Sequence, residues 1–282
     1  MIETKVSSTK KEVIIGSGRP TILIGERINP TGKKKLAESL RAGDMEYVRQ
    51  EALGQVKAGA DILDVNVGVL GLDQTVMLPQ VVQIIMETVD VPLCIDSDSP
   101  AAIEAALKVY KGKPFINSVS GEKKSLANVL PLVKEHGAAV IGLIQDDEGT
   151  PTTLERRMAI AHKIIEKAEA LGIPRQDVVI DCLAFAIGAN SKAGVLVIDT
   201  IHRIKDELGV NVTMGASNVS FGMPDRDLLT NGFVASVVAA GATSLIVDVA
   251  KVRPIVLAVD LVLDRDPYAK RYIKAYRERL NK

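Results

Sequence analysis

The chain has 282 residues, of which 47% are hydrophobic and 3% aromatic, and its 35 basic and 35 acidic side chains give a formal net charge of zero. A neutral chain without tryptophan lacks both the positive field and the stacking surfaces that nucleic-acid binding needs. The length matches a single (β/α)8 barrel of about 250 residues with a short extension.

The sequence indicates neither secretion nor insertion into a membrane. The first 20 residues carry charges but no apolar core of signal-peptide length. The most apolar tract, residues 235–263, is interrupted by Asp248, Lys251 and Asp260, among others. The two cysteines, Cys94 and Cys182, fall in predicted strands without the spacing of a metal site or a disulfide. We therefore expect a cytoplasmic protein with buried, reduced thiols.

The N-terminal residues do not follow the period of the rest of the chain. Val13–Ile15, followed by Gly16 and Gly18, predicts a short strand that caps the bottom of a barrel. We accordingly divide the chain into residues 1–20, an N-terminal extension, and residues 21–282, a single barrel domain that ends in a helix.

Eight apolar, β-branched runs follow, separated by stretches long enough for helices, and this pattern predicts an α/β fold of the (β/α)8 TIM barrel type. The runs are residues 21–29, 61–68, 92–97, 114–118, 139–145, 178–183, 212–218 and 244–248. A doubly wound open sheet shares the alternation, but neither G-x-G-x-x-G nor G-x-x-x-x-G-K-[ST] is present. The barrel is therefore favoured.

Helix ends between these runs carry legible signals. Ser99-Pro100 supplies an N-cap followed by a proline at the first helical position. Thr152 and Glu155 have the spacing of a capping box. Four glycines fall at the predicted C-termini of helices, where a left-handed residue is needed before the next strand: Gly59, Gly137, Gly172 and Gly241.

Each predicted strand ends in a carboxylate or carboxamide, and strand ends of a barrel converge on one face, where active sites of this fold lie. The groups are Glu26, Asn29, Asp64, Asn66, Asp96, Asn117, Gln145, Asp181, Asn218 and Asp248. A ring of mostly hydrogen-bond acceptors suits a neutral or donor-rich heterocycle and does not suit a phosphate.

These groups differ in how readily a structural role explains them. Asp181 is followed by an apolar stretch with no helix to cap, so a buried carboxylate there needs a partner. Asp96 has no clear structural role, because Asp98 and Ser99 are better placed to cap the next helix. Asn117 and Asn218 precede small-residue turns that they could merely stabilise, or else face a ligand.

The remaining strand ends leave both possibilities open. Asp64 and Asn66 alternate on one strand face and suit a polar layer closing the barrel as well as ligand contact. Glu26 could form an ion pair with Arg27 at the barrel mouth or support the site from behind. Gln145 and Asp248 are interpreted as structural, or as supports of ligand-binding groups.

The sequence predicts neither a metal site nor a nucleophilic triad. His136, His162 and His202 fall at predicted helices and form neither a metal-binding cluster nor a Ser-His-Asp set, so no metal is expected. The lysines at 33–35 and 123–124 are solvated loop charge or an attraction for an anionic ligand tail or an acidic partner.

Six motifs, in order, give the chain a family resemblance. GERINPTG, LDVNVG, LCIDS, FINSVSGE, VVIDCL and GASNVSFG resemble the pterin-binding methyltransferases. These are the methyltetrahydrofolate:corrinoid protein methyltransferases and the folate domain of cobalamin-dependent methionine synthase. The resemblance spans residues 21–265 and implies a pterin-binding, dihydropteroate synthase-like barrel. No D-x-H-x-x-G corrinoid motif occurs, so the corrinoid (cobalamin) is expected on a separate partner protein.

The resemblance also implies residue roles, with tetrahydrofolate or 5-methyltetrahydrofolate as the substrate. Asp181 would take the ring N–H and 2-amino group of the pterin, as its acceptor-only carboxylate allows. Asp96 and Asn117 would hold other ring nitrogens, with Asp64 and Asn66 completing the floor. Asn218 would reach the methyl-bearing nitrogen as the catalytic residue.

Further residues complete the implied site. Ser217 and Ser220 would join a hydrogen-bond network around Asn218, and Glu26 would support it. Phe221 stands where some relatives carry glutamine, so this network differs or the folate ring packs against Phe221. No strand-end histidine, lysine or cysteine competes for the proton. The methyl group could move in either direction, as in O-demethylase or similar one-carbon systems, and a homodimer is expected.

Two alternative functions remain. Dihydropteroate synthase shares the barrel, but its lysine after the seventh strand and Arg-x-His on the eighth, which hold a pyrophosphate, are replaced here by SNVSFG and DVAKV. A non-catalytic folate-binding barrel would bind folate without exchanging a methyl group.

Overall fold

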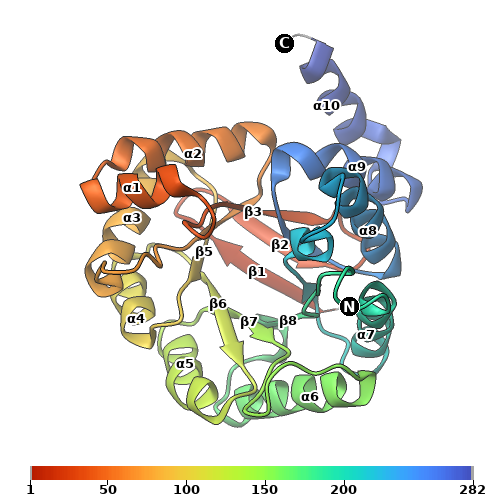
Figure 1. The fold of residues 1–282 in the computed structure, drawn as a ribbon, viewed down its shortest axis with the longest axis horizontal. Coiled ribbons are helices and arrows are strands. Elements are labelled where there is room, and N and C mark those ends of the chain that lie inside the picture. The colour runs from red at the N-terminus through yellow and green to blue at the C-terminus, as the bar shows by residue number, and fades with distance from the viewer. Residues whose placement is uncertain (1, 281–282) are drawn as a thin grey trace.

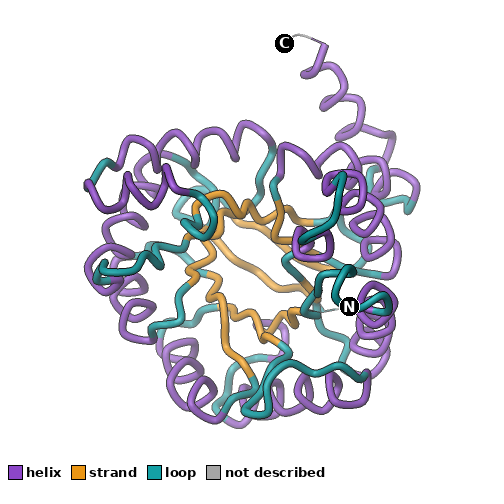
Figure 2. Tube along the Cα trace, viewed as in Figure 1, coloured by secondary structure: helices purple, strands orange, loops and turns teal. Residues whose placement is uncertain are grey.

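The computed structural model describes residues 2–280, and its helices form a ring around eight parallel strands (Figures 1 and 2). The order of the strands in the sheet is β10-β3-β4-β5-β6-β7-β8-β9. The strands are β3 (Ile22–Ile28), β4 (Ile62–Val65), β5 (Leu93–Asp96), β6 (Phe115–Ser120), β7 (Ala139–Leu143), β8 (Val178–Asp181), β9 (Val212–Thr213) and β10 (Ser244–Val247). The predicted (β/α)8 barrel is thus confirmed.

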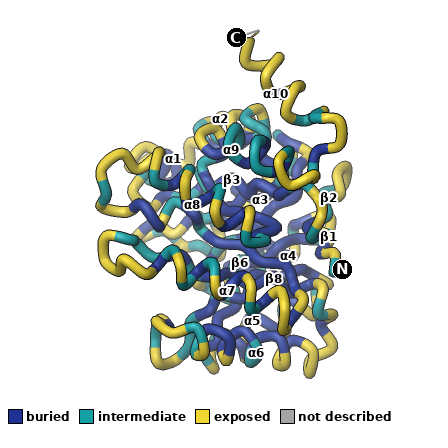
Figure 3. The backbone as a smooth tube through the Cα atoms, turned by 90° about the vertical axis from the view of Figure 1, so that its right-hand side faces the viewer, coloured by how far each residue is buried: buried dark blue, intermediate teal, exposed yellow. Residues whose placement is uncertain are grey.

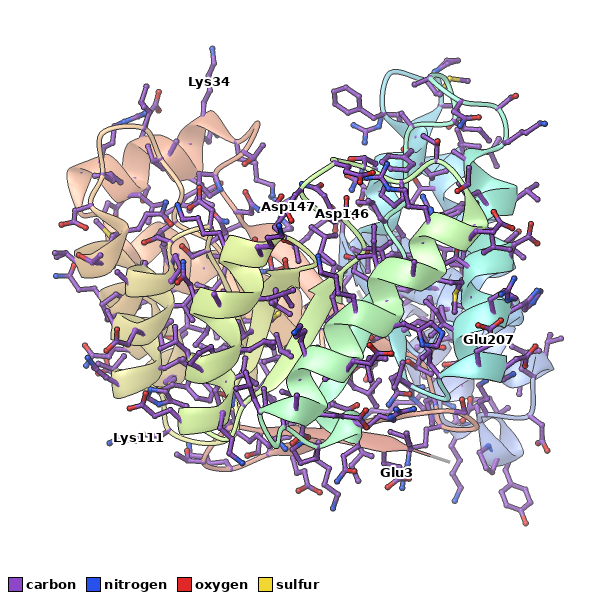
Figure 4. The ribbon with its side chains drawn as sticks, turned by 90° about the horizontal axis from the view of Figure 1, so that it is seen from below. Glu3, Lys34, Lys111, Asp146, Asp147 and Glu207 are labelled. Atoms are coloured by element: carbon purple, nitrogen blue, oxygen red, sulfur yellow. The ribbon has the colours of Figure 1, made fainter. Side chains whose placement is uncertain are left out.

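The sheet closes into a barrel between β9 and β10, although β9 has only two residues. Gly215 and Ile246 form an isolated parallel bridge, and the Ile246 N–H donates to the Met214 carbonyl oxygen at 3.0 Å. Because the eight barrel strands are parallel, their carboxyl ends all lie on the same face of the barrel. Lys34, which follows β3, and Glu3, at the N-terminus, lie at opposite ends of the barrel (Figure 4).

Ten α-helices lie within the described residues. They are α1 (Lys34–Ala42), α2 (Met45–Ala58), α3 (Gln74–Thr88), α4 (Pro100–Val109), α5 (Lys123–Glu135), α6 (Leu154–Ala170), α7 (Ala193–Glu207), α8 (Arg226–Ala240), α9 (Val249–Val262) and α10 (Lys270–Leu280). The main apolar core lies between the helix ring and the outer faces of the strands, where side chains such as Leu63, Ile85 and Ile180 are fully buried. This packing is what holds the strand ends in place.

A hairpin closes the lower end of the barrel. β1 (Glu3–Ser7) pairs antiparallel with β2 (Glu12–Gly16), which contains the strand predicted at Val13–Ile15. Val6, Val13 and Ile15 belong to the same buried cluster as the inward side chains of the barrel. Asn211 fixes the hairpin by donating to the hydroxyl of Thr4 and to the Ile15 carbonyl, each at 3.0 Å.

The helix-end predictions are confirmed with one shift. The Ser99 hydroxyl accepts from the Ala102 N–H ahead of Pro100, and Gly59 ends α2 with φ of 103°. A Cβ at Gly59 would also require the Arg253 side chain to move, but the positive φ is what favours glycine there. The capping box at Thr152 is wrong by one residue, because Thr153 is the N-cap and accepts from Arg156.

Helix α10 extends away from the ring and is exposed over much of its length (Figure 3). Its Ala275 is buried, whereas Tyr276 is 50% and Leu280 68% exposed. Within residues 2–280 no helix combines the length and apolar character needed to cross a membrane.

Candidate functional site

The upper ends of the strands surround a cavity of about 370 Å³. It is lined by Glu26, Asn29, Thr31, Lys33, Asp64, Asp96, Asn117, Leu143, Asp181, Leu183, Ala184, Gly215, Ser217, Asn218 and Ile246. Most of the side chains singled out in the sequence therefore meet in one place, although they come from strands spread over the whole chain. The lining holds four carboxylates and a single lysine.

Asp64, Asp96 and Asn117 form a connected floor because their strands are neighbours. In register, Asp96 pairs with Asn117, and the Asn117 amide donates to the Asp64 carboxylate at 3.1 Å. Asp64 and Asp96 come from the neighbouring strands β4 and β5 and lie close enough for each to influence the other. Burial, and next to it the charge of Asp96, raises the pKa of Asp64 well above its usual range. Burial also raises the pKa of Asp96, to about 6.

Asp181 ends β8 on another wall of the cavity and is 8% exposed. Its carboxylate accepts a hydrogen bond of 2.7 Å from the Leu183 N–H. Burial raises the pKa of Asp181 to about 6, while this hydrogen bond and the charge of Arg157 act in the opposite direction. At neutral pH Asp181 is thus an ionised acceptor with lone pairs left for a ligand.

Asn218 lies on a short 3-10 helix, Ala216–Ser220, that follows β9. Asn218 is exposed, whereas its neighbours Ala216 and Val219 are buried and anchor the turn. The Ser217 hydroxyl contacts both carboxylate oxygens of Glu26 at 2.9 Å. Burial raises the pKa of Glu26, partly offset by Ser217 and by Lys33. A carboxyl group whose pKa is raised by burial therefore stands beside the Asn218 turn.

Two of the predicted residues do not line this cavity. Asn66 lies in the adjoining hollow, where its side chain accepts from the Gly68 N–H at 2.7 Å and also hydrogen-bonds Asp96. Ser220 is fully buried, and its hydroxyl contacts the Ser217 carbonyl oxygen at 3.1 Å. Both residues brace side chains or backbone of the cavity from behind.

The alternative interpretation of Glu26 as the ion-pair partner of Arg27 is not supported, because Arg27 pairs with other carboxylates. Successive residues of a strand point to opposite faces, so Arg27 leaves the cavity and bonds Glu51 at 2.8 Å. Asp248, interpreted as structural, forms the other ion pair of Arg27 at 3.5 Å. Gln145 donates to Glu122 at 3.2 Å and also lies outside the cavity lining.

Lys33 lines the cavity, whereas the sequence left it open between loop charge and attraction for an anionic ligand or an acidic partner. Its ammonium donates to the carbonyl oxygens of Glu26 and Asn29 at 3.0 and 3.2 Å, and burial lowers its pKa. Three consecutive lysines, 33–35, give no sequence signal that separates the first from the other two. Phe221, in contrast, is 68% exposed on the rim, with the Arg226 guanidinium 5.7 Å from its ring.

Other chemistries find little support in the geometry. Cys94 and Cys182 are free and buried, and burial raises the pKa of each thiol. Within residues 2–280 no group of three histidine, cysteine, aspartate or glutamate side chains is arranged to hold a metal ion. The cavity offers acceptors, one amide at an exposed turn and a protonatable carboxylate, which together suit a flat heterocycle rich in N–H donors.

The fold and this cavity define an enzyme-type barrel whose site lies at the carboxyl ends of the strands. The chain belongs to the pterin binding enzyme family, since that family's model matches residues 25–248. This confirms the family resemblance in the six sequence motifs.

Individual relatives are of two kinds. Over 91% of this chain and 96% of its own length, the methylcorrinoid:tetrahydrofolate methyltransferase of Eubacterium limosum is 28% identical. The methionine synthase of Mycobacterium leprae is 30% identical over 93% of this chain, which spans only 24% of that protein.

Solved structures with the same fold include dihydropteroate synthases. That of Xanthomonas albilineans superposes with a TM-score of 0.71 at 19% identity, covering 93% of this chain and 98% of that one. The Thermus thermophilus enzyme gives 0.68 at 20% identity, covering 92% and 99%. At this level of identity the similarity shows the barrel architecture alone.

Proposed function

We propose that this protein transfers a methyl group between N5 of tetrahydrofolate and the cobalt of a corrinoid bound to a separate protein. The observation that carries the proposal is that Asp181, at the end of β8, and Asn218, on the 3-10 helix after β9, line one cavity. One supplies a buried carboxylate for recognition, and the other supplies an exposed amide for the reacting nitrogen. The methylcorrinoid:tetrahydrofolate methyltransferase of nearly equal length supports the same reaction.

Recognition of the pterin would rest on complementary hydrogen bonds. An ionised Asp181 presents acceptors to the ring N–H and the 2-amino group, and charge-assisted pairs of this kind are the strongest hydrogen bonds in proteins. Asn117 already donates to Asp64, so the amide oxygen of Asn117 is left to accept from the ligand. Because burial raises the pKa of Asp64 well above its usual range, its carboxyl group would keep a proton, and this floor would then donate as well as accept.

Catalysis would require help for a poor leaving group. As the bond between the methyl carbon and N5 breaks, the electron pair stays on N5, which then takes a proton. In the direction from folate to the corrinoid, the reduced cobalt would be the methyl acceptor. Asn218 would donate to N5 more strongly in the transition state than in the ground state, which is the condition for acceleration. Glu26, held by Ser217, would supply the proton reservoir.

The remaining predicted residues would act through these groups. Asn66 orients Asp96, and Ser220 fixes the carbonyl of Ser217, so neither needs to touch the ligand. Lys33 stands next to Glu26 and, by its charge, favours the ionised form of that carboxylate.

The test is an anaerobic mixture of the protein, 5-methyltetrahydrofolate and cob(I)alamin, with the cobalt(I) absorbance followed over time. Loss of that absorbance with formation of methylcobalamin is the expected result. Asn218→Ala should abolish most of the rate. Asn190→Ala is a matched control, because Asn190 is an exposed asparagine on the loop after β8 and does not line the cavity.

Other results would contradict the proposal. Folate binding without methyl exchange, with free cobalamin and with a reconstituted corrinoid protein, would indicate a binding-only barrel. Release of pyrophosphate from a pterin pyrophosphate in the presence of 4-aminobenzoate would indicate a dihydropteroate synthase-like enzyme. Absence of folate binding would remove the pterin site altogether.

A further inference from the structure

Arg157 is a charged side chain that is completely buried in α6. It lies on the same helical stripe as Ala161, Ile164 and Ala168, which face the core. Burial lowers the pKa of its guanidinium, and desolvating a charge in this way is costly unless every donor is used. In the described chain its hydrogen bonds all go to backbone carbonyl oxygens. A cation kept at such cost needs an explanation.

The guanidinium holds the two residues that follow Asp181. It donates to the carbonyl oxygens of Cys182 and Leu183 at 2.6 and 3.0 Å, and to that of Pro151 at 3.4 Å. The aromatic ring of Phe185 lies 5.3 Å from its central carbon. Arg157 thereby ties the loop after β8 to the loop before α6, behind the cavity wall.

The segment held in this way determines where the Asp181 carboxylate points. Leu183 has a φ of 51°, a left-handed conformation that is unfavourable for a residue with a Cβ. Only in this turn does the Leu183 N–H reach back to the Asp181 carboxylate at 2.7 Å. Hydrogen bonds from Arg157 to the carbonyls on either side of that N–H stabilise the turn.

We propose that Arg157 is a positioning residue: it clamps the Cys182–Leu183 turn so that the Asp181 carboxylate is oriented toward the ligand. The identity of that ligand rests on the proposed function, but the clamp itself does not. Lysine could not replace it fully, because one ammonium cannot span two carbonyls in the fork geometry of a guanidinium.

Several charged groups surround Asp181 and must be separated in a test. Arg157 faces it from α6, and the neutral thiol of Cys182 adjoins it. Across the cavity stand Asp64 and Asp96 from β4 and β5, with Glu26 and Lys33 from β3 and the loop after it. Of these, Arg157 is the charge that lowers the pKa of Asp181.

The experiment compares Arg157→Gln and Arg157→Lys with the wild type in two ways. The Asp181 carboxyl is titrated in the ligand-free protein by ¹³C NMR with labelled aspartate, its resonance assigned by its absence in Asp181→Asn. Folate affinity is measured from pH 6 to pH 8. Phe185→Leu is the matched control, since it removes the ring beside the guanidinium and leaves its hydrogen bonds.

In Arg157→Gln we expect the Asp181 titration to move to higher pH and folate binding to weaken roughly tenfold at pH 6, with a smaller loss at pH 8. In Arg157→Lys the Asp181 titration should stay closer to that of the wild type than the folate affinity does, because lysine retains the charge but cannot hold both carbonyl groups. A purely structural residue would weaken binding equally at each pH and leave the titration unmoved.

The proposal is overturned if both variants titrate and bind as the wild type does. If Arg157→Gln does not fold, Arg157→Lys decides by the same two readouts. A wild-type protein that binds no folate would refute the proposed function, and the ligand-free titration would still decide whether Arg157 positions Asp181.

Discussion

The Ser217 hydroxyl lies 2.9 Å from both carboxylate oxygens of Glu26, although 191 residues separate the two in the chain. This contact joins the first barrel strand to the turn that carries Asn218. It also links the ionisation of a buried carboxylate to the geometry of the proposed reaction centre.

Ser217→Ala should cost more stability at pH 8 than at pH 5. The hydroxyl lowers the pKa of Glu26 against the effect of burial, so it favours the ionised form that dominates at high pH. We expect a loss of about 1–2 kcal/mol at pH 8 and less at pH 5, measured by urea denaturation. The pH dependence of this loss should vanish in a Glu26→Gln background, and its persistence there would separate Ser217 from Glu26.

Asn218→Ala should lower kcat roughly 100-fold and change the folate Kd little, because a donor that acts in the transition state contributes mainly to the rate. Single-turnover methyl transfer and equilibrium binding measure the two quantities separately. A variant with weakened binding and an unchanged rate would make Asn218 a binding residue only.

Asp181→Asn should weaken folate binding by about 1.5–3 kcal/mol, since one acceptor becomes a donor opposite the N–H groups of the pterin. Asp147→Asn is the control, because Asp147 is exposed on the same face of the molecule and does not line the cavity (Figure 4). Equilibrium titration with tetrahydrofolate gives the comparison. Equal affinities in the two variants would exclude Asp181 from the site.

Ile15→Ala should destabilise the protein by about 2–5 kcal/mol, because Ile15 is fully buried in the cluster that fills the barrel interior. Folate affinity should be unchanged, since the hairpin lies at the end opposite the cavity. Thermal unfolding and ligand titration on the same sample measure both. A matching loss of affinity would show that the two ends of the barrel are not independent.

Much of the site could be predicted because its residues occupy strand ends, and a barrel brings strand ends together whatever their separation in the chain. Asp64, Asp96, Asn117 and Asp181 all follow this rule. Their polar character inside apolar runs was a sufficient signal, and the cavity lining includes each of them.

Residues off the strands were harder to assign. Lys33 reaches the cavity only through the conformation of the loop after β3, which no periodicity encodes. Ser220 looked equivalent to Ser217, but the 3-10 turn points one hydroxyl to Glu26 and the other to the backbone and to Thr230. Arg157 did leave a trace, because it interrupts the apolar stripe of α6.

In the described chain the hairpin closes the lower end of the barrel, where Val6, Val13 and Ile15 are buried in the interior cluster. The cavity lies at the upper end, so we expect a small molecule to reach Asp181 and to leave it through the upper end of the barrel. Anything that covers this end, including a partner protein during a reaction, would hold the bound molecule in place until it moves away. The turnover rate would then depend on how fast the partner protein leaves, because the bound molecule could leave only after it.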